Sequence, residues 1–189
     1  MKFRHLLAKS AEDPLSPLPA QTVVGHTVNV LSAADAFVSS LAAETVVLIG
    51  DSVTTSQWET AITAAAWLHD LGKANDHFQR AVRDRSFRQG VRHETLGFVV
   101  AGTILDDWLA PLWAKLPDWM RAGVLFAVGG HHLKFPSQQV ERGHPEVAFL
   151  GSHSQFTEVL RIGAERFGLN TPPRADRPDV RASATRPIR

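Results

Sequence analysis

The chain contains no cysteine and no tyrosine among its 189 residues. The absence of cysteine excludes disulfide frameworks, cysteine-based zinc sites and thiol nucleophiles, so any metal must be held by histidine and carboxylate side chains. Long apolar runs are also absent: Leu96 to Leu105 and Ala122 to Gly130 fall well short of the ~20 residues that a membrane helix requires. The amino terminus carries no secretory signal, because Lys9 interrupts its short apolar run. These absences predict a soluble, cytoplasmic protein.

An excess of charge of either sign is missing too, with 20 basic against 19 acidic residues and a formal net charge of +1. An average this close to zero indicates neither a protein that coats nucleic acid nor an acidic tail, so any argument from charge has to rest on local clusters. The length and the 44% hydrophobic content are typical of one ordinary globular domain.

Apolar residues recur at helical spacing through most of the chain, which predicts an all-α fold. In the first such segment, one face carries His26, Val30, Ala33, Phe37 and Leu41. Residues 46–49 are the one candidate strand, and they are too few to decide between strand and helix. The predicted helices cover residues 22–43, 56 to about 72, 75–84, 92–109, 117–130 and 152–167.

Local signals set the expected helix ends. Ser56 and Glu59 form a capping-box pattern at the start of the second helix, Pro111 is expected to close the fourth, and Gly168 to terminate the last. Beyond residue 170 the chain is rich in proline and arginine and poor in large apolar residues, so it cannot bury enough surface to order itself. We therefore divide the chain into a folded domain, residues 1–170, and a linker or disordered tail, residues 171–189.

The strongest chemical signal is the dipeptide His69-Asp70 at the end of a predicted helix. Adjacent residues on a helix diverge by about 100°, so both side chains reach one ion only near the helix end, where Gly72 allows the backbone to turn. An imidazole and a carboxylate suit first-row divalent metals, and Lys73 could meet an anionic substrate. The competing interpretation is a chance dipeptide, with His69 in the core and Asp70 as a helix cap.

Four further histidines turn the dipeptide into a candidate metal centre. They fall on, or at the end of, the apolar faces of three other predicted helices, where an unpaired imidazole would be costly. One histidine in such a position is more often a satisfied core residue, but several helices that direct histidines to one interior place form a ligand cluster. The four are His26, His93, His131 and His132.

These residues resemble the HD superfamily of metal-dependent phosphohydrolases, whose ordered signature is His, then His-Asp, then His, then further His or Asp. Within it, the chain is most similar to the HD nuclease domain of the type I CRISPR-associated helicase-nuclease. The resemblance covers Leu6 to Leu169 and rests on Ala8-Lys9-Ser10, Gly25-His26-Thr27, the segment from His69 to Ala74, Phe78-Gln79, Arg92-His93-Glu94 and Gly130-His131-His132. It implies an HD-domain helical bundle, with a metal centre between helices, that acts as a nuclease in antiviral defence.

The resemblance also implies a site. Asp70 would bridge two divalent ions, with Mn, Fe, Ni or Co expected first and Mg as a further candidate, which activate a water and stabilise the entering and leaving oxygens of a phosphodiester. Lys73 would join Asp70 as a catalytic residue by neutralising charge on the scissile phosphate. The implied partners are single-stranded DNA, a CRISPR helicase subunit or domain, and a guide-RNA surveillance complex. The implied ligands are His26 and His69 for one ion and His93, His131 and His132 for the other.

One departure from the family concerns its last ligand, an aspartate on a later helix. Asp176 and Asp179 lie in the proline- and arginine-rich tail, where solvation is the more common fate of an acidic residue, and His153 and Glu158 have no motif to support them. We therefore expect either that the chain ends before this motif or that this version lacks it.

A cluster of arginines follows the His69-Asp70 motif, with Phe78 and Phe87 interleaved. Guanidinium groups suit the phosphates of a nucleic acid and aromatic rings can stack on unpaired bases, although a solvated helix face has the same composition. No Walker A pattern is present, so ATP-driven translocation would have to come from another chain or segment. The predicted nucleic-acid-binding residues are Arg80, Arg83, Arg85, Arg88, Arg92 and Lys134.

Two other functions remain open at this point. A small-molecule phosphohydrolase that acts on nucleotides or other phosphoesters would need a closed pocket rather than an arginine-lined opening. A catalytically impaired binding or scaffold module would explain the missing acidic ligand.

Overall fold

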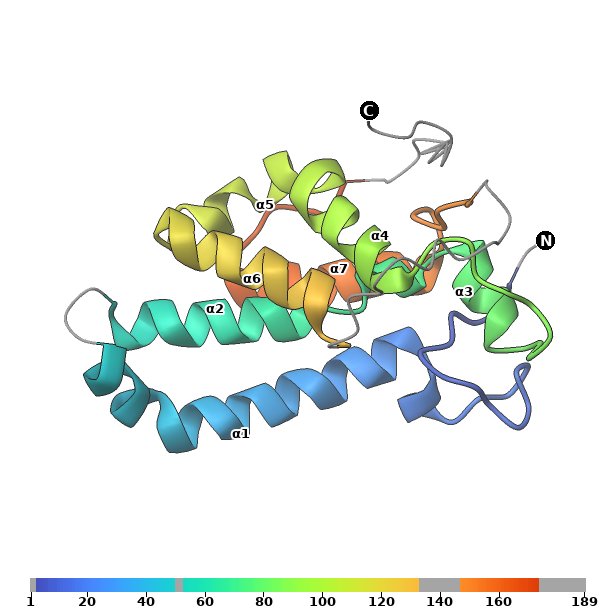
Figure 1. The fold of residues 1–189 in the computed structure, drawn as a ribbon, viewed down its shortest axis with the longest axis horizontal. Helices are drawn as coiled ribbons and strands as arrows, with labels where there is room; N and C mark the ends of the chain where they lie inside the picture. Colours follow the sequence, from blue (N-terminus) through green and yellow to red (C-terminus); the bar gives the residue numbers. More distant parts are fainter. Residues whose placement is uncertain (1–2, 50–52, 133–146, 174–189) are drawn as a thin grey trace, which may run out of the picture.

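The computed structural model describes residues 3–49, 53–132 and 147–173 (Figure 1). Within these ranges the chain is helical and has no β-strand, which confirms the predicted all-α class. A 3-10 turn, η2 (Leu71–Lys73), and a π-helical turn, η3 (Val100–Ile104), interrupt the regular helices. The helices are α1 (Val23–Ile49), α2 (Thr55–Leu68), α3 (Asp76–Ala81), α4 (His93–Val99), α5 (Asp106–Trp113), α6 (Asp118–Gly130) and α7 (Ser154–Phe167).

Helix α2 is the centre of the arrangement. It packs along α1, and it also contacts α6 and α7, while α4 packs against α6 and against the turn η2 that follows α2. Figure 1 shows α1 and α2 running side by side, with α6 crossing beside α2 and α4 and α5 above it. The carboxyl end of α2 is therefore surrounded by other elements.

The last turn of α2 is held by the largest buried side chain of the described residues. Trp67 is fully buried, and its indole Nε1 donates a hydrogen bond of 2.8 Å to the carbonyl of Val159 on α7. Leu68 beside it and Phe156 on α7 are buried as well. This packing fixes the backbone immediately before His69 and Asp70.

The helix ends differ from the sequence prediction in two places. The second helix is capped by Thr54, whose side chain accepts from the backbone of Gln57 while Gln57 Oε1 accepts from Thr54, so the box does not use Ser56 and Glu59. The predicted helix of residues 92–109 is broken at Leu105, and Pro111 lies inside α5 instead of closing it. Pro111 is the sixth residue of α5, where it has no N–H to donate to the helix backbone, and α5 ends two residues later at Trp113.

The buried face of α1 also differs from the predicted one. The helix continues through residues 46–49, which settles the choice that the sequence left open there in favour of helix. Its buried residues include Leu31, Ala34 and Val38, whereas Phe37 and Leu41 of the predicted face are each 44% exposed. Both stripes are apolar and lie about 100° apart, and packing against α2 and α7, not hydrophobicity alone, selects the buried one.

One glutamine of α3 links the amino-terminal segment to α3 and to η2 by hydrogen bonds. Gln79 is fully buried; its Oε1 accepts from Leu7 N at 2.9 Å, and its Nε2 donates to the carbonyls of Leu7 and Lys73, both at 2.9 Å. The segment around Leu7, α3 and η2 are thus joined through a single side chain whose polar atoms are all paired. This network holds the turn that carries Lys73.

Most of the predicted tail lies outside the described residues, as does Lys134, so the domain boundary at residue 170 stays a prediction. Among the described helices, no single one is long and apolar enough to cross a membrane. One pair meets the requirements of length and composition only when both members are counted together, His93–Ile104 with Asp106–Trp113, and it is bent by 80°.

Candidate metal centre

Asp70 stands where the chain leaves α2. His69 is the C-cap of that helix with helical backbone angles, and at Asp70 the backbone turns to φ −109° and ψ 11° before entering η2. This change of direction lets two adjacent side chains reach the same place, as the dipeptide at a helix end predicts. The carboxylate of Asp70 is 2% exposed and therefore lies inside the molecule.

The two oxygens of Asp70 face different groups of histidines. Oδ2 lies 3.0 Å from Nε2 of His26 and 3.1 Å from Nε2 of His69. Oδ1 lies 3.6 Å from Nε2 of both His93 and His131, and Nε2 of His132 lies 3.0 Å from Nε2 of His93. We call the first group, His26, His69 and Asp70, cluster A and the second, His93, His131 and His132, cluster B. Within each cluster the possible ligand atoms lie within 4.8 Å of one another.

Two of these histidines place their second ring nitrogen against a backbone carbonyl. Nδ1 of His69 lies 2.8 Å from the carbonyl of Ala66, and Nδ1 of His131 lies 2.9 Å from the carbonyl of Val128. A carbonyl only accepts, so Nδ1 carries a hydrogen in both rings, and Nε2 is the nitrogen that faces Asp70.

The residues present fit a metal ion. Among the described residues, Oδ1 of Asp70 and Nε2 of His131 are buried atoms with no hydrogen-bond partner, although they face each other. Two acceptors in this position repel, and an unsatisfied buried polar atom is costly, unless a cation lies between them. Imidazole nitrogens and a carboxylate are the donor set that first-row divalent metals prefer.

The protonation states suit metal binding as well. Burial alone would raise the pKa of Asp70, but His26, His69 and the charge of Lys73 hold that pKa well below its usual range. Burial lowers the pKa of His93 to about 3 and also lowers the pKa of His131, despite the opposing charge of Asp70. At neutral pH the carboxylate is therefore ionised and these two imidazoles are neutral, which is the state that binds metals.

Lys73 reaches the same carboxylate. Its Nζ lies 2.6 Å from Oδ2 of Asp70 and 5.4 Å from the centre of the Phe78 ring, and the residue is 8% exposed. The ammonium group is thus part of the centre itself.

The predicted arginine cluster separates into two kinds of residue. Arg83 donates to the carbonyls of Gln79 and His5 and to Oε1 of Gln79, so its guanidinium is used inside the fold. Arg92 donates from Nε to Glu94. Arg80 is exposed and lies 3.7 Å from Asp76, and the remaining two, Arg85 and Arg88, are exposed in the connection from α3 to α4.

Sequence reasoning did not single out Glu94. Its Oε2 lies 3.3 Å from Nδ1 of His93, while its Oε1 accepts from Arg92 Nε at 2.5 Å. The one sequence feature that could have pointed to Glu94 is its position directly after the candidate ligand His93. Adjacent side chains on a helix do not normally meet, so this spacing gives no reason to pair them.

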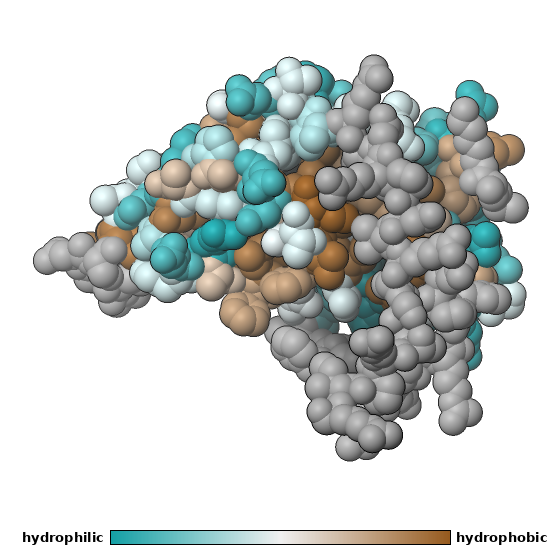
Figure 2. Space-filling model, turned by 90° about the horizontal axis from the view of Figure 1, so that it is seen from above, coloured by the Kyte–Doolittle hydropathy of each residue, from teal (hydrophilic) through white to brown (hydrophobic). Residues whose placement is uncertain are grey.

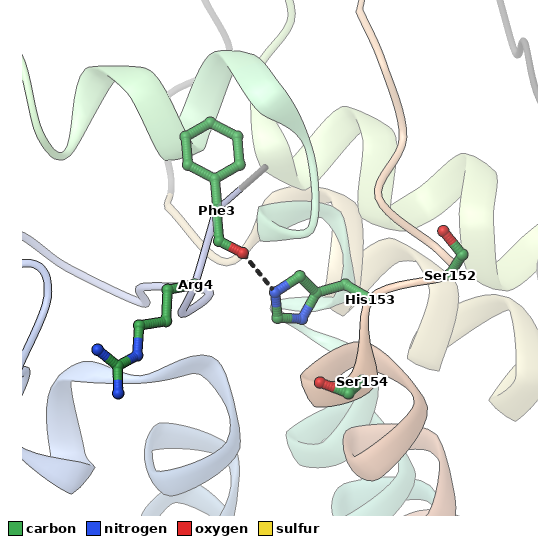
Figure 3. A pocket seen from close by; sticks show the side chains of 5 residues that line it. All are labelled: Phe3, Arg4, Ser152, His153 and Ser154. Carbon is green, nitrogen blue, oxygen red and sulfur yellow. Dashed lines mark hydrogen bonds between the residues drawn. The ribbon is translucent and has the colours of Figure 1, made fainter. Parts of the chain in front are cut away.

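Two of the residues considered as substitutes for the missing acidic ligand are described by the structure, and both lie outside the two clusters. His153 caps α7 and its Nε2 lies 3.0 Å from the carbonyl of Phe3, beside a pocket of about 500 Å³ lined by Phe3, Arg4, Ser152, His153 and Ser154 (Figure 3). Glu158 pairs with Arg161 on the outer face of α7. Asp176 and Asp179 lie outside the described residues.

In this helical domain, histidines from several helices gather around the buried carboxylate of Asp70. This arrangement is that of a metal-dependent phosphohydrolase of the HD superfamily, a class that binds divalent metals. The histidines are His26, His69, His93, His131 and His132. The family model for the HD domain of Cas3 matches residues 7–187, and the chain belongs to that family.

A Myxococcus xanthus (strain DK1622) protein named as a CRISPR-associated nuclease/helicase Cas3 is 33% identical over 182 residues. The match covers 90% of this chain and 24% of that protein, so the chain spans about a quarter of its relative's length. No solved structure matches the chain significantly.

Proposed function

We propose that this chain is a nuclease domain that cleaves single-stranded DNA in CRISPR antiviral defence, with residues 1–170 as the catalytic unit. The observation that carries the proposal is the placement of Asp70, whose two oxygens each face a different group of histidines. A single carboxylate shared in this way is the arrangement that a pair of metal ions requires for phosphodiester hydrolysis.

Two divalent ions are the proposed cofactor, Mn, Fe, Ni or Co before Mg. Cluster A would hold one with His26 and His69, cluster B would hold the other, and Asp70 would contribute an oxygen to each. When bound, such ions activate a water for attack and stabilise the oxygens of the phosphodiester. The preference for transition metals follows from the many imidazole donors, because Mg prefers a shell of oxygen atoms.

Lys73 is the proposed phosphate-binding cation of the centre. Its ammonium is buried against Asp70 and is positioned by the backbone of η2, which Gln79 holds through the carbonyl of Lys73. A fixed cation in a site of low dielectric stabilises charge that develops on the phosphate. We therefore assign Lys73, with Asp70, to the catalytic residues.

A polymeric substrate is favoured over a small phosphoester by the exposed cations of the connection that leads from α3 to His93, the first residue of α4. The connection from α3 to α4 exposes Arg85 and Arg88, and Arg80 lies 5.6 Å over the ring of Phe87. Surfaces that bind single-stranded nucleic acid typically combine cations, which contact the phosphate backbone, with aromatic rings, on which the bases stack. Of the predicted nucleic-acid-binding residues, we propose that Arg80, Arg85 and Arg88 contact DNA, and Lys134 remains a further candidate.

The proposed partners follow from the relative's name, which includes a helicase. We infer that ATP-driven strand delivery comes from a helicase domain or subunit, and that a guide-RNA complex selects the DNA. The sequence of this chain contains no Walker A motif that could supply the motor itself.

The test is cleavage of a circular single-stranded DNA by the purified protein with Mn²⁺, Ni²⁺, Co²⁺ or Fe²⁺, beside duplex DNA and a panel of nucleotides. Asp107→Ala, an exposed carboxylate outside both clusters, is the matched control for Asp70→Ala. Cleavage of the circle that Asp70→Ala abolishes and Asp107→Ala retains supports the proposal. Hydrolysis of nucleotides without cleavage of DNA would replace it with the small-molecule phosphohydrolase, and the absence of both activities would leave the scaffold module.

A further inference from the structure

The histidines of the centre differ in what holds their second ring nitrogen. His69 and His131 direct Nδ1 to backbone carbonyls, those of Ala66 and Val128. Nδ1 of His93 instead lies 3.3 Å from a side-chain atom, Oε2 of Glu94, which is within ion-pair distance but outside hydrogen-bond geometry. Each carbonyl lies three residues before its histidine on the same helix, so these two contacts form whenever the helix does. The carboxylate of Glu94 is a side chain, and it can be removed by substitution.

Glu94 is built into the interior rather than placed on a surface. It is 5% exposed, and Oε1 accepts a hydrogen bond of 2.5 Å from Nε of Arg92, which leaves Oε2 for His93. Burial of an acidic side chain costs free energy unless nearby groups offset it, and the groups that lie against Glu94 are Arg92 and His93.

Adjacent residues on a regular helix point in directions about 100° apart, yet Glu94 and His93 meet. They stand at the first two positions of α4, where the preceding residue Arg92 is extended with φ −72° and ψ 142° and serves as N-cap. From that position Arg92 reaches forward to Glu94, two residues later, and restrains the carboxylate. The helix start thus brings three consecutive residues into one chain of contacts, Arg92 to Glu94 to His93.

We propose that Glu94 is a positioning residue for His93 and that Arg92 acts on the same histidine by restraining Glu94. The inference rests on the metal centre proposed above. A carboxylate on Nδ1 fixes the tautomer and orientation of the ring and increases the basicity of Nε2, and its loss typically weakens metal binding by about 10- to 100-fold. The effect is expected on cluster B alone, because Glu94 lies against His93, whereas His26 and His69 lie against Asp70.

Arg92 therefore has a role other than the phosphate contact predicted from the sequence. Its Nε is engaged by Glu94, and its side chain is 30% exposed. Replacement of Arg92 is expected to alter metal binding in the absence of any DNA.

Titration of the metal-free protein with Co²⁺, followed by the visible absorption of the bound ion and by calorimetry, tests the assignment without reference to cleavage. His132→Ala identifies the binding event that belongs to cluster B, and His26→Ala the event that belongs to cluster A. Glu94→Gln preserves the size of the side chain but removes its charge, and Glu59→Gln on the exposed face of α2 is the matched control.

The expected result is that Glu94→Gln weakens the event lost in His132→Ala by about 10- to 100-fold and changes the other by less than about twofold. Arg92→Gln should weaken the same binding event by a smaller factor. If circular dichroism shows that Glu94→Gln is unfolded, Arg92→Gln is the variant that tests the inference. Unchanged affinities in the folded variants, or equal weakening of both events, would overturn the inference while leaving the metal centre intact. A wild-type protein that binds no Co²⁺ would instead overturn the proposed function, and this inference with it.

Discussion

Gly72 lies directly against the backbone carbonyl of His93, with no room for a β-carbon between them. The space that a side chain would need is also taken by the backbone nitrogen of Gly97 on α4. Because Gly72 follows Asp70 by two residues, this close approach of η2 to α4 sets how far Asp70 lies from His93. The separation of the two clusters therefore depends on a glycine that belongs to neither of them.

Gly72→Ala should destabilise the metal-free protein by about 1–3 kcal/mol or more, because the added carbon meets backbone that cannot rotate away. Urea unfolding measures the change. The matched control is Gly123→Ala on α6, where the added carbon meets nothing within 4 Å and alanine should stabilise the helix by about 0.5–1 kcal/mol. A Gly72→Ala protein as stable as the wild type would show that η2 and α4 are not in this contact.

The stability of the metal-free protein should fall as the pH is lowered from 7 to 5. The unfolded chain takes up a proton on His93 near its ordinary pKa of 6.5, whereas burial lowers the folded pKa to about 3, so acid favours the unfolded state. One such group contributes at most about 1.4 kcal/mol per pH unit. Thermal unfolding in the presence of a chelator should give a shallower pH dependence for His93→Gln than for the wild type. Identical slopes in the two proteins would contradict the burial of a neutral His93.

Arginine substitutions should separate DNA contacts from structural contacts. Arg85→Ala and Arg88→Ala should each reduce the slope of log affinity against log salt concentration by about 0.7 for a single strand, the value of one lost phosphate contact. Arg83→Ala should leave the slope unchanged and lower stability, because its guanidinium serves Gln79 and His5. Fluorescence anisotropy over a salt series measures the slopes. An equal change of slope in Arg83→Ala would mean that this side chain leaves its internal partners to bind DNA.

The convergence of the histidines was predictable because each lies at a helix end or on an apolar face, features that spacing and residue type reveal. The structure brings His26, His93, His131 and His132 around Asp70, as the sequence led us to expect, although their role as ligands stays a prediction. Lys73 followed from the same motif. The division of these residues between two oxygens of one carboxylate is a matter of geometry on the scale of an ångström, which no sequence pattern contains.

Other features depended on tertiary contacts. On α1, two apolar stripes compete, and the partners of the helix bury Leu31 and Val38 and leave Phe37 and Leu41 exposed. Arg83 belongs to a run of arginines that look alike in the sequence, but its guanidinium donates to the carbonyl of His5, a residue far away in the sequence. Glu94 shows the same limit, since its function arises from the geometry of a helix start rather than from spacing.

The sharing of Asp70 by both clusters is tested most directly by counting the metal ions that the purified protein retains. Mn²⁺-loaded protein is separated from free metal and its metal content measured for the wild type, His26→Ala and Asp70→Asn, with folding checked by circular dichroism. We predict two ions in the wild type, one in His26→Ala and none in Asp70→Asn, since each cluster needs its own oxygen of Asp70. A folded Asp70→Asn protein that retains one or both ions would contradict the account.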